Sequence, residues 1–94
     1  MSQRTAVVAS RVGLHARPAS IFTQAVAACG VDVTIAKPGE EPMDASSILM
    51  VMALGAGPGQ TVVLEADGPE ADRVLDELVV LLETDLDAEW ARRR

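Results

Sequence analysis

The residue of this sequence best suited to covalent chemistry is His15, the only histidine of the chain. It lies within the run Gly13 to Ala19, which reads Gly-Leu-His-Ala-Arg-Pro-Ala. A neutral imidazole is a nucleophile, and a histidine ring can form a covalent intermediate. A lone histidine is more often an ordinary surface or core residue, so its neighbours must decide between the two interpretations.

Features of the neighbouring residues favour a functional histidine. Gly13 permits an unusual backbone turn, and Pro18 suits the first turn of a helix, where an N–H group has no acceptor. His15 is therefore expected beside a helix N-terminus, where the N–H groups of Ala16 and Arg17 form a phosphate-binding site. The helix dipole adds about half a positive charge there. A phosphoryl group carried on the ring is expected to lie at this positive end, close to Arg17.

These parts suit a phosphoryl carrier but do not make a complete enzyme. Phosphoryl transfer requires mainly positioning and charge stabilisation, which a histidine, an arginine and a helix end supply. The sequence has no Gly-rich phosphate loop and no metal-ligand spacing, so we expect neither a cofactor nor a metal. The donor and acceptor chemistry is therefore expected to come from partner proteins.

The composition restricts the class of protein. A chain of 94 residues fits one domain of modest core, expected to span residues 1–94. The formal net charge of −6 argues against a nucleic-acid partner, which would require clustered Lys and Arg. The arginines at 92–94 are interpreted as a solvated tail. No apolar stretch approaches the ~18 residues of a membrane span and no signal-peptide pattern is present, so we expect a cytoplasmic protein without membrane contact.

Periodic apolar residues predict a sheet and two amphipathic helices. Residues 4–8, 31–35 and 62–66 have strand character, and a turn at 37–42 leads to a short fourth strand near Met43. Glycines and a proline at 55–59 break the chain before the last strand. Helical spacing appears from Ala19 to Cys29, and Gly30 is expected to close this helix. It appears again from Ala71 to Leu82, with Pro69 and Glu70 at the start and Asp72 in the first turn. Both helices are expected to cover one sheet face, with Cys29 buried and reduced.

Every residue from Ile48 to Leu54 is apolar. A helix this short cannot bury all of its faces in a small domain, so part of it is expected to form an exposed docking surface. The alternative is a central buried strand. Ser46 or Ser47 is expected to cap the helix, and a phosphate placed there would act as a regulatory charge.

The two motifs together closely resemble the HPr family, the histidine-containing phosphocarriers of the bacterial phosphoenolpyruvate-dependent sugar phosphotransferase system. The residues that carry the resemblance are Gly13 to Ala19, Ser47, Ile48, Leu49, Val51, Met52, Leu54 and Gly55. The resemblance implies an α+β fold, an open-faced β-sandwich in which three helices cover one face of a four-stranded antiparallel sheet. A monomer is expected, because the carrier must present its histidine to two partners in turn.

The resemblance also implies roles for individual residues. His15 would accept phosphate at Nδ1 from phosphorylated enzyme I and donate it to enzyme IIA components, while Arg17 would stabilise the phosphoryl group. Ile48, Leu49 and Met52 would belong to the partner-binding surface. Ser47, and not Ser46, would be the serine that an ATP-dependent kinase modifies in some members.

Two alternatives stay open at this level. One is a regulatory binding module in which phosphorylation of Ser47 governs docking to a transcriptional regulator or an enzyme. The other is a carrier in a parallel pathway linked to nitrogen metabolism or to another kinase. Met50 stands where relatives often have Gly, and Gln24 and Ala27 replace lysines common near the first helix. These departures weaken the kinase interpretation and do not affect His15.

Overall fold

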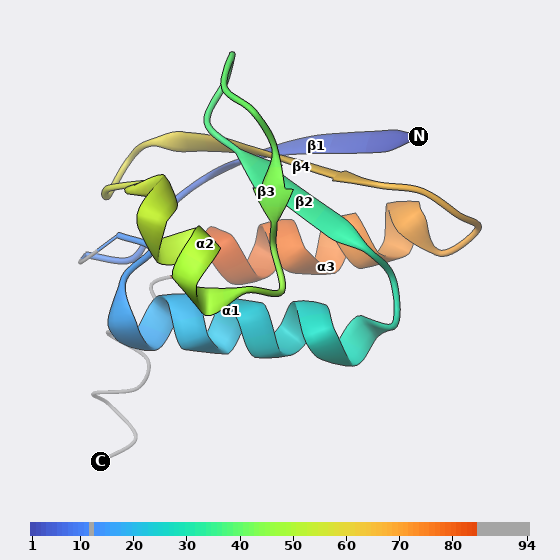
Figure 1. Ribbon diagram of the computed structural model, residues 1–94, viewed down its shortest axis with the longest axis horizontal. Helices are drawn as coiled ribbons and strands as arrows, with labels where there is room; N and C mark the ends of the chain where they lie inside the picture. Colours follow the sequence, from blue (N-terminus) through green and yellow to red (C-terminus); the bar gives the residue numbers. More distant parts are fainter. Residues whose placement is uncertain (12, 85–94) are drawn as a thin grey trace.

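The computed structural model describes residues 1–11 and 13–84, and within these residues it contains four strands and three helices. The strands and helices form two layers, with the sheet in the upper layer of Figure 1. In chain order the elements are β1 (Ser2–Val7), α1 (Ala16–Cys29), β2 (Val33–Ala36), β3 (Met43–Asp44), α2 (Ile48–Leu54), β4 (Thr61–Ala66) and α3 (Ala71–Leu82).

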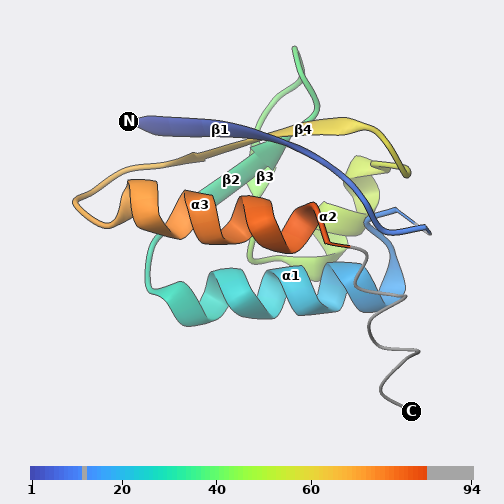
Figure 2. The same cartoon turned by 180° about the vertical axis from the view of Figure 1, so that it is seen from behind.

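The sheet is antiparallel, with the strand order β1-β4-β2-β3. Pairing of β1 with β4 places Val7 opposite Thr61. The chain that leaves β1 and the chain that enters β4 therefore lie at the same end of the sheet. Figure 2 shows these two connections together at one end of the molecule, beside the start of α1. The topology thus brings residues 8–11 and 13–15 next to residues 55–60.

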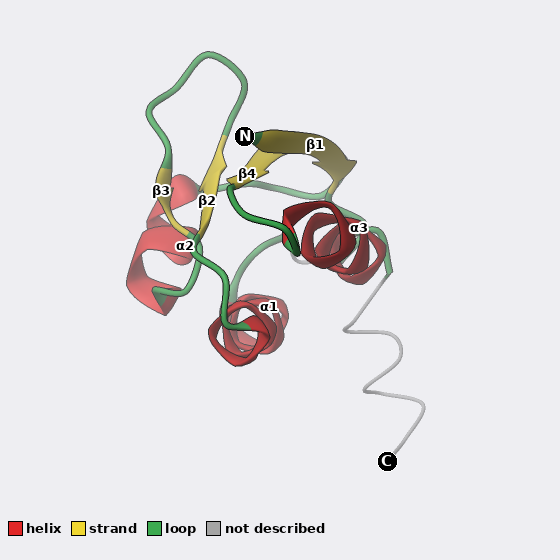
Figure 3. Cartoon of the chain, turned by 90° about the vertical axis from the view of Figure 1, so that its right-hand side faces the viewer, coloured by secondary structure: helices red, strands yellow, loops and turns green. Residues whose placement is uncertain are grey.

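Alternation along the strands creates one buried face. In β4, Val62, Leu64 and Ala66 are buried, while Val63 and Glu65 between them are only partly buried. The helices cover the buried face, and the opposite face stays open, as Figure 3 shows from the side. α3 packs on β1 and β4, and α1 packs on α2 and α3. The largest fully buried side chains come from both layers and include Phe22, Ile35, Leu64 and Leu75.

The helix ends follow the residues predicted for them. α1 is closed by Gly30, whose φ of 73° lies in the left-handed region that glycine adopts without strain. α2 is closed in the same way by Gly55, with φ of 70°. α3 begins after Glu70 and carries Asp72 in its first turn, where negative charge interacts favourably with the helix dipole.

The structure confirms the predicted fold class and corrects some details. The apolar segment 48–54 is a helix, so the alternative of a buried strand is wrong. The first strand begins at Ser2, before the predicted Arg4, and β2 begins at Val33 instead of Val31. Cys29 is half-buried and not buried as predicted, because it ends α1 and is followed by the exposed Gly30. The arginines at 92–94 lie outside the described residues.

Two features are absent from the residues that the structure describes. No helix there has the length and hydropathy that crossing a membrane would require. No group of three or more His, Cys, Asp or Glu side chains in the same part of the chain is placed to hold a metal ion.

The contrast between Leu64 and Leu49 tests the two-layer packing. Leu64 is fully buried, whereas Leu49 is 79% exposed. We expect Leu64→Ala to lower the free energy of unfolding by roughly 2–5 kcal/mol, because it leaves a cavity in the core. The matched variant Leu49→Ala is expected to lower it by less than about 0.5 kcal/mol. Urea unfolding measures both, and equal losses would contradict the placement of α2.

Candidate functional site

His15 lies at the junction between the loop that follows β1 and the first turn of α1. It is the N-cap residue of α1, with extended backbone angles of φ −138° and ψ 153°, and its side chain makes no capping hydrogen bond. The residue is exposed. A partner protein can therefore reach the ring without any opening of the fold.

The loop before His15 is held by backbone contacts to residues 56 and 57. The N–H of Leu14 donates to the Ala56 carbonyl at 2.9 Å, and the N–H of His15 donates to the Gly13 carbonyl at 3.0 Å. Gly13 has a φ of 74°, and a Cβ added there would lie 2.6 Å from the Ala56 oxygen. Only glycine fits this close approach, which confirms the unusual turn predicted at Gly13. Leu14 itself is buried and anchors the loop in the core.

Ala16, the first residue of α1, has a φ of 44°, which is the only positive φ of a non-glycine residue in the described part of the chain. The left-handed region is disfavoured for residues with a Cβ, by about 1–2 kcal/mol. The chain therefore turns sharply between the extended His15 and the helix. Residues with strained backbone angles cluster at functional sites, so the φ of Ala16 supports the interpretation of His15 as a functional residue.

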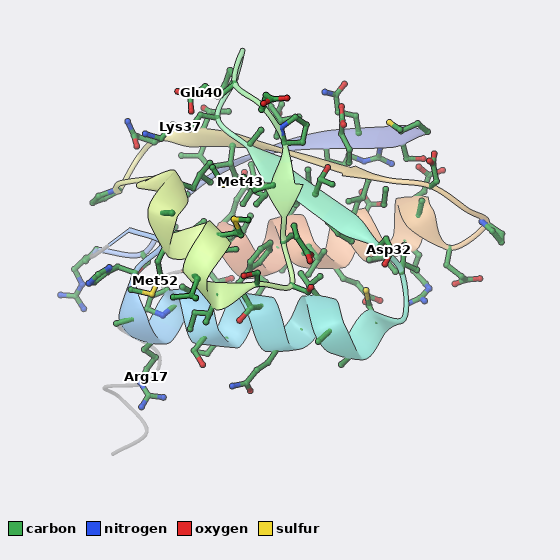
Figure 4. All side chains as sticks on the ribbon, in the orientation of Figure 1. Arg17, Asp32, Lys37, Glu40, Met43 and Met52 are labelled. Atoms are coloured by element: carbon green, nitrogen blue, oxygen red, sulfur yellow. The ribbon has the colours of Figure 1, made fainter. Side chains whose placement is uncertain are left out.

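The start of α1 has the electrostatic character of an anion site. An α-helix leaves the N–H groups of its first turn without acceptors inside the helix, and its dipole makes this end positive. The first turn contains no acidic residue, and Pro18, which has no N–H, is buried in it. Arg17 is exposed and extends away from the helix in Figure 4. Ala16 and Arg17 are thus the first two residues of the helix, as the sequence predicted.

Ser47 is the residue that caps α2. Its Oγ accepts a hydrogen bond from the N–H of Met50 at 3.3 Å. Ser46 has a different role, because its hydroxyl and its N–H both donate to a carboxylate oxygen of Asp44, at 2.7 and 2.9 Å. Both hydrogen bonds lower the pKa of the Asp44 carboxyl group, and the bond from the Ser46 hydroxyl is the larger cause. The structure therefore separates the two serines that the sequence left as alternatives.

The predicted docking residues of α2 differ in exposure. Leu49 is 79% exposed, Met50 47% and Ile48 39%. Met52 is only partly buried by its contacts with the core, and Figure 4 shows it at the same end of the molecule as Arg17. We define the apolar patch of α2 as the three exposed side chains Ile48, Leu49 and Met50. Met50 is not among the docking residues predicted from the sequence.

Charge is distributed unevenly around His15. The segments 18–31 and 45–64, which hold most of α1 and all of α2, contain no Asp, Glu, Lys or Arg. Arg11 and Arg17, both exposed, flank His15 in the sequence. Four acidic residues line a hollow at the opposite end of the molecule: Asp32, Glu65, Asp67 and Glu70. Figure 4 labels Asp32 at that end.

Three features of the site had no local signal in the sequence. The positive φ of Ala16 depends on the packing of the whole loop, since alanine itself prefers other conformations. The contacts of Ala56 and Gly57 with the His15 loop depend on strand pairing over a long sequence separation. The third feature is the hydrogen bond that the Gly57 N–H donates to Oε1 of Gln60, at 2.7 Å.

Comparison with known proteins agrees with this fold. A family model described as the PTS HPr component phosphorylation site matches residues 2–84. The match covers most of the chain, and the chain therefore belongs to the HPr family. Its class is that of the phosphocarriers of the phosphotransferase system.

Individual relatives and structures lead to the same family. The phosphocarrier protein HPr of Streptomyces coelicolor is 46% identical over 82 residues, covering 87% of this chain and 88% of the relative. The phosphocarrier protein NPr of Shewanella violacea is 31% identical over 85 residues, covering 90% and 92%. The crystal structure of HPr-C-His from Thermoanaerobacter tengcongensis superimposes with a TM-score of 0.82 at 32% identity, covering 90% of this chain and 94% of that chain.

A pair of glycine variants tests the close packing of the His15 loop. Gly13 and Gly30 both have positive φ, but an added Cβ meets no atom within 4 Å at Gly30. We expect Gly30→Ala to lower the free energy of unfolding by about 1 kcal/mol through backbone strain alone. Gly13→Ala is expected to lower it by about 2–4 kcal/mol, because the clash with Ala56 is added. Chemical denaturation that finds the two losses equal would refute the close approach.

Proposed function

We propose that His15 accepts a phosphoryl group from phosphorylated enzyme I on its Nδ1 and donates it to enzyme IIA components. The observation that carries this proposal is the placement of an exposed histidine at the positive start of α1, in a loop that packs against residues 56 and 57. Exposure serves a carrier, whose reacting atom must meet two different proteins. The family to which the chain belongs supports the same chemistry.

The step needs little more than a positioned neutral imidazole. The lone pair of Nδ1 attacks phosphorus, the bond from phosphorus to the donor breaks, and its electron pair leaves with the donor group. Charge on the transferring oxygens is stabilised by the first-turn N–H groups of α1 and by the guanidinium of Arg17. The phosphate-binding residues are therefore Ala16, through its backbone, and Arg17. The same groups serve the reverse step, in which enzyme IIA takes the phosphoryl group.

The apolar patch of α2 serves in this proposal as the docking surface for enzyme I and enzyme IIA. Its exposed side chains would be buried by a partner, and burial of each large one contributes roughly 1.5–3 kcal/mol. Met52 extends the patch toward the core. Because segments 18–31 and 45–64 carry no charge, docking depends on apolar burial, with Arg17 as a local charge beside the reacting ring.

Two other assignments have specific support. The similarity to an NPr of Shewanella violacea favours a parallel, nitrogen-related carrier pathway with the same chemistry. The position of Ser47 at the N-terminus of α2 favours regulation, since phosphate there would place charge beside the apolar patch. The main proposal ranks first because His15 is present and accessible. Pairwise transfer assays with the enzyme I proteins of both pathways separate the carrier assignments.

Phosphorylation of variants tests the role of His15. Incubation with phosphoenolpyruvate and enzyme I is expected to add one acid-labile phosphate, detected by mass spectrometry. His15→Ala is expected to take up none, and Arg17→Gln to take it up at least about tenfold more slowly. Ser47→Ala serves as the control and should be labelled like the unchanged protein. An acid-labile phosphate on His15→Ala would rule out the proposal.

Salt and surface variants test the apolar character of docking. Raising the ionic strength from about 0.1 M to 0.5 M screens exposed charges strongly, yet we expect the KM for enzyme I to rise less than about threefold. Leu49→Ser is expected to raise it about tenfold or more. The matched control is Val80→Ser, because Val80 is 67% exposed but lies on α3. A strong salt effect with no effect of Leu49→Ser would contradict the proposed docking mode.

A further inference from the structure

The peptide unit that joins Ala56 to Gly57 is held from both sides. Its carbonyl oxygen accepts the hydrogen bond from the Leu14 N–H at 2.9 Å, and its N–H donates to Oε1 of Gln60 at 2.7 Å. In a trans peptide the C=O and the N–H point in opposite directions. Two hydrogen bonds at opposite edges therefore fix the rotation of this peptide plane.

This peptide plane lies in a segment with little restraint of its own. Glycines occupy positions 55, 57 and 59, and glycine loses more conformational entropy on ordering than any other residue. Gly57 also has no side chain that could pack and resist rotation. A side-chain hydrogen bond to its N–H is accordingly an effective restraint on the plane.

Gln60 is itself fixed to the sheet. Its N–H donates to the Gly57 carbonyl at 3.1 Å, and its own carbonyl accepts from the Val8 N–H at 2.9 Å. The N–H of Gly59 donates to the Val8 carbonyl at 2.8 Å, which completes the attachment to the chain leaving β1. The Gln60 side chain thus extends from an anchored backbone to the peptide that accepts the Leu14 hydrogen bond.

We propose that Gln60 is a positioning residue for His15. Its side chain holds the Ala56–Gly57 peptide, this peptide holds Leu14 and packs against Gly13, and Gly13 accepts the hydrogen bond from the His15 N–H. Rotation of the peptide would withdraw the Ala56 oxygen from Leu14 and loosen the loop that presents the ring. The inference rests on the proposed function of His15, and Gln60 makes no contact with the transferred group.

The first test is amide hydrogen exchange and requires no partner protein. Leu14 is buried, so exchange of its N–H reports on its bond to Ala56. In Gln60→Leu, which keeps the side-chain size but removes the acceptor, we expect exchange at Leu14 to become about fivefold to tenfold faster. Gln60→Glu retains an acceptor and should restore slow exchange. Gln3→Leu is the matched control, because Gln3 bonds to Glu65 on the open sheet face.

The second test follows phosphoryl uptake from phosphorylated enzyme I. In Gln60→Leu we expect kcat to fall about fivefold to tenfold with KM changed less than about twofold, since the apolar patch of α2 is unchanged. Gln60→Glu is expected to recover most of kcat, and Gln3→Leu to lose none. Unchanged Leu14 exchange in Gln60→Leu, or faster exchange with an unchanged kcat, would overturn the positioning role. Failure of the unchanged protein to accept phosphate would instead overturn the proposed function.

Discussion

The hydrogen bond from the Leu14 N–H to the Ala56 carbonyl joins the two segments on which the candidate site depends. It forms because β1 and β4 pair with Val7 opposite Thr61, so that segments far apart in the sequence leave the sheet at the same end. The bond adds to the burial of Leu14 and to the hydrogen bond from the Gly13 N–H to the Ser10 carbonyl. These contacts form the platform that carries His15 at the start of α1.

The other parts of the molecule have different roles around this platform. The core of α1, α3 and the inner sheet face supplies stability, while the short α2 cannot bury all of its apolar residues and leaves a patch exposed. The carboxylates of Asp32, Asp67 and Glu70 gather around a hollow at the far end, away from Arg17. The phosphoryl group that we propose for His15 would therefore lie away from these carboxylates.

Sequence patterns predicted what depends on local chemistry. The strand periods, the helix closed by Gly30, the cap at one of two serines and the turn at Gly13 all follow from residue type and spacing. The positive φ of Ala16, the partial exposure of Cys29 and the support from Ala56 and Gln60 do not. These features result from tertiary packing, in which residues close in space are distant in sequence. The selection of Ser47 over Ser46 as the helix cap likewise required the orientation of Asp44.

The central claim is that a phosphoryl group on His15 lies against the N-terminus of α1. Two-dimensional amide NMR of the free and phosphorylated protein tests it directly. A phosphate accepting hydrogen bonds from the first turn should shift the amide signals of Ala16 and Arg17 downfield more than any others, while the amides of β2 and β3 stay in place. Unchanged signals at Ala16 and Arg17, with the largest shifts elsewhere, would contradict the account.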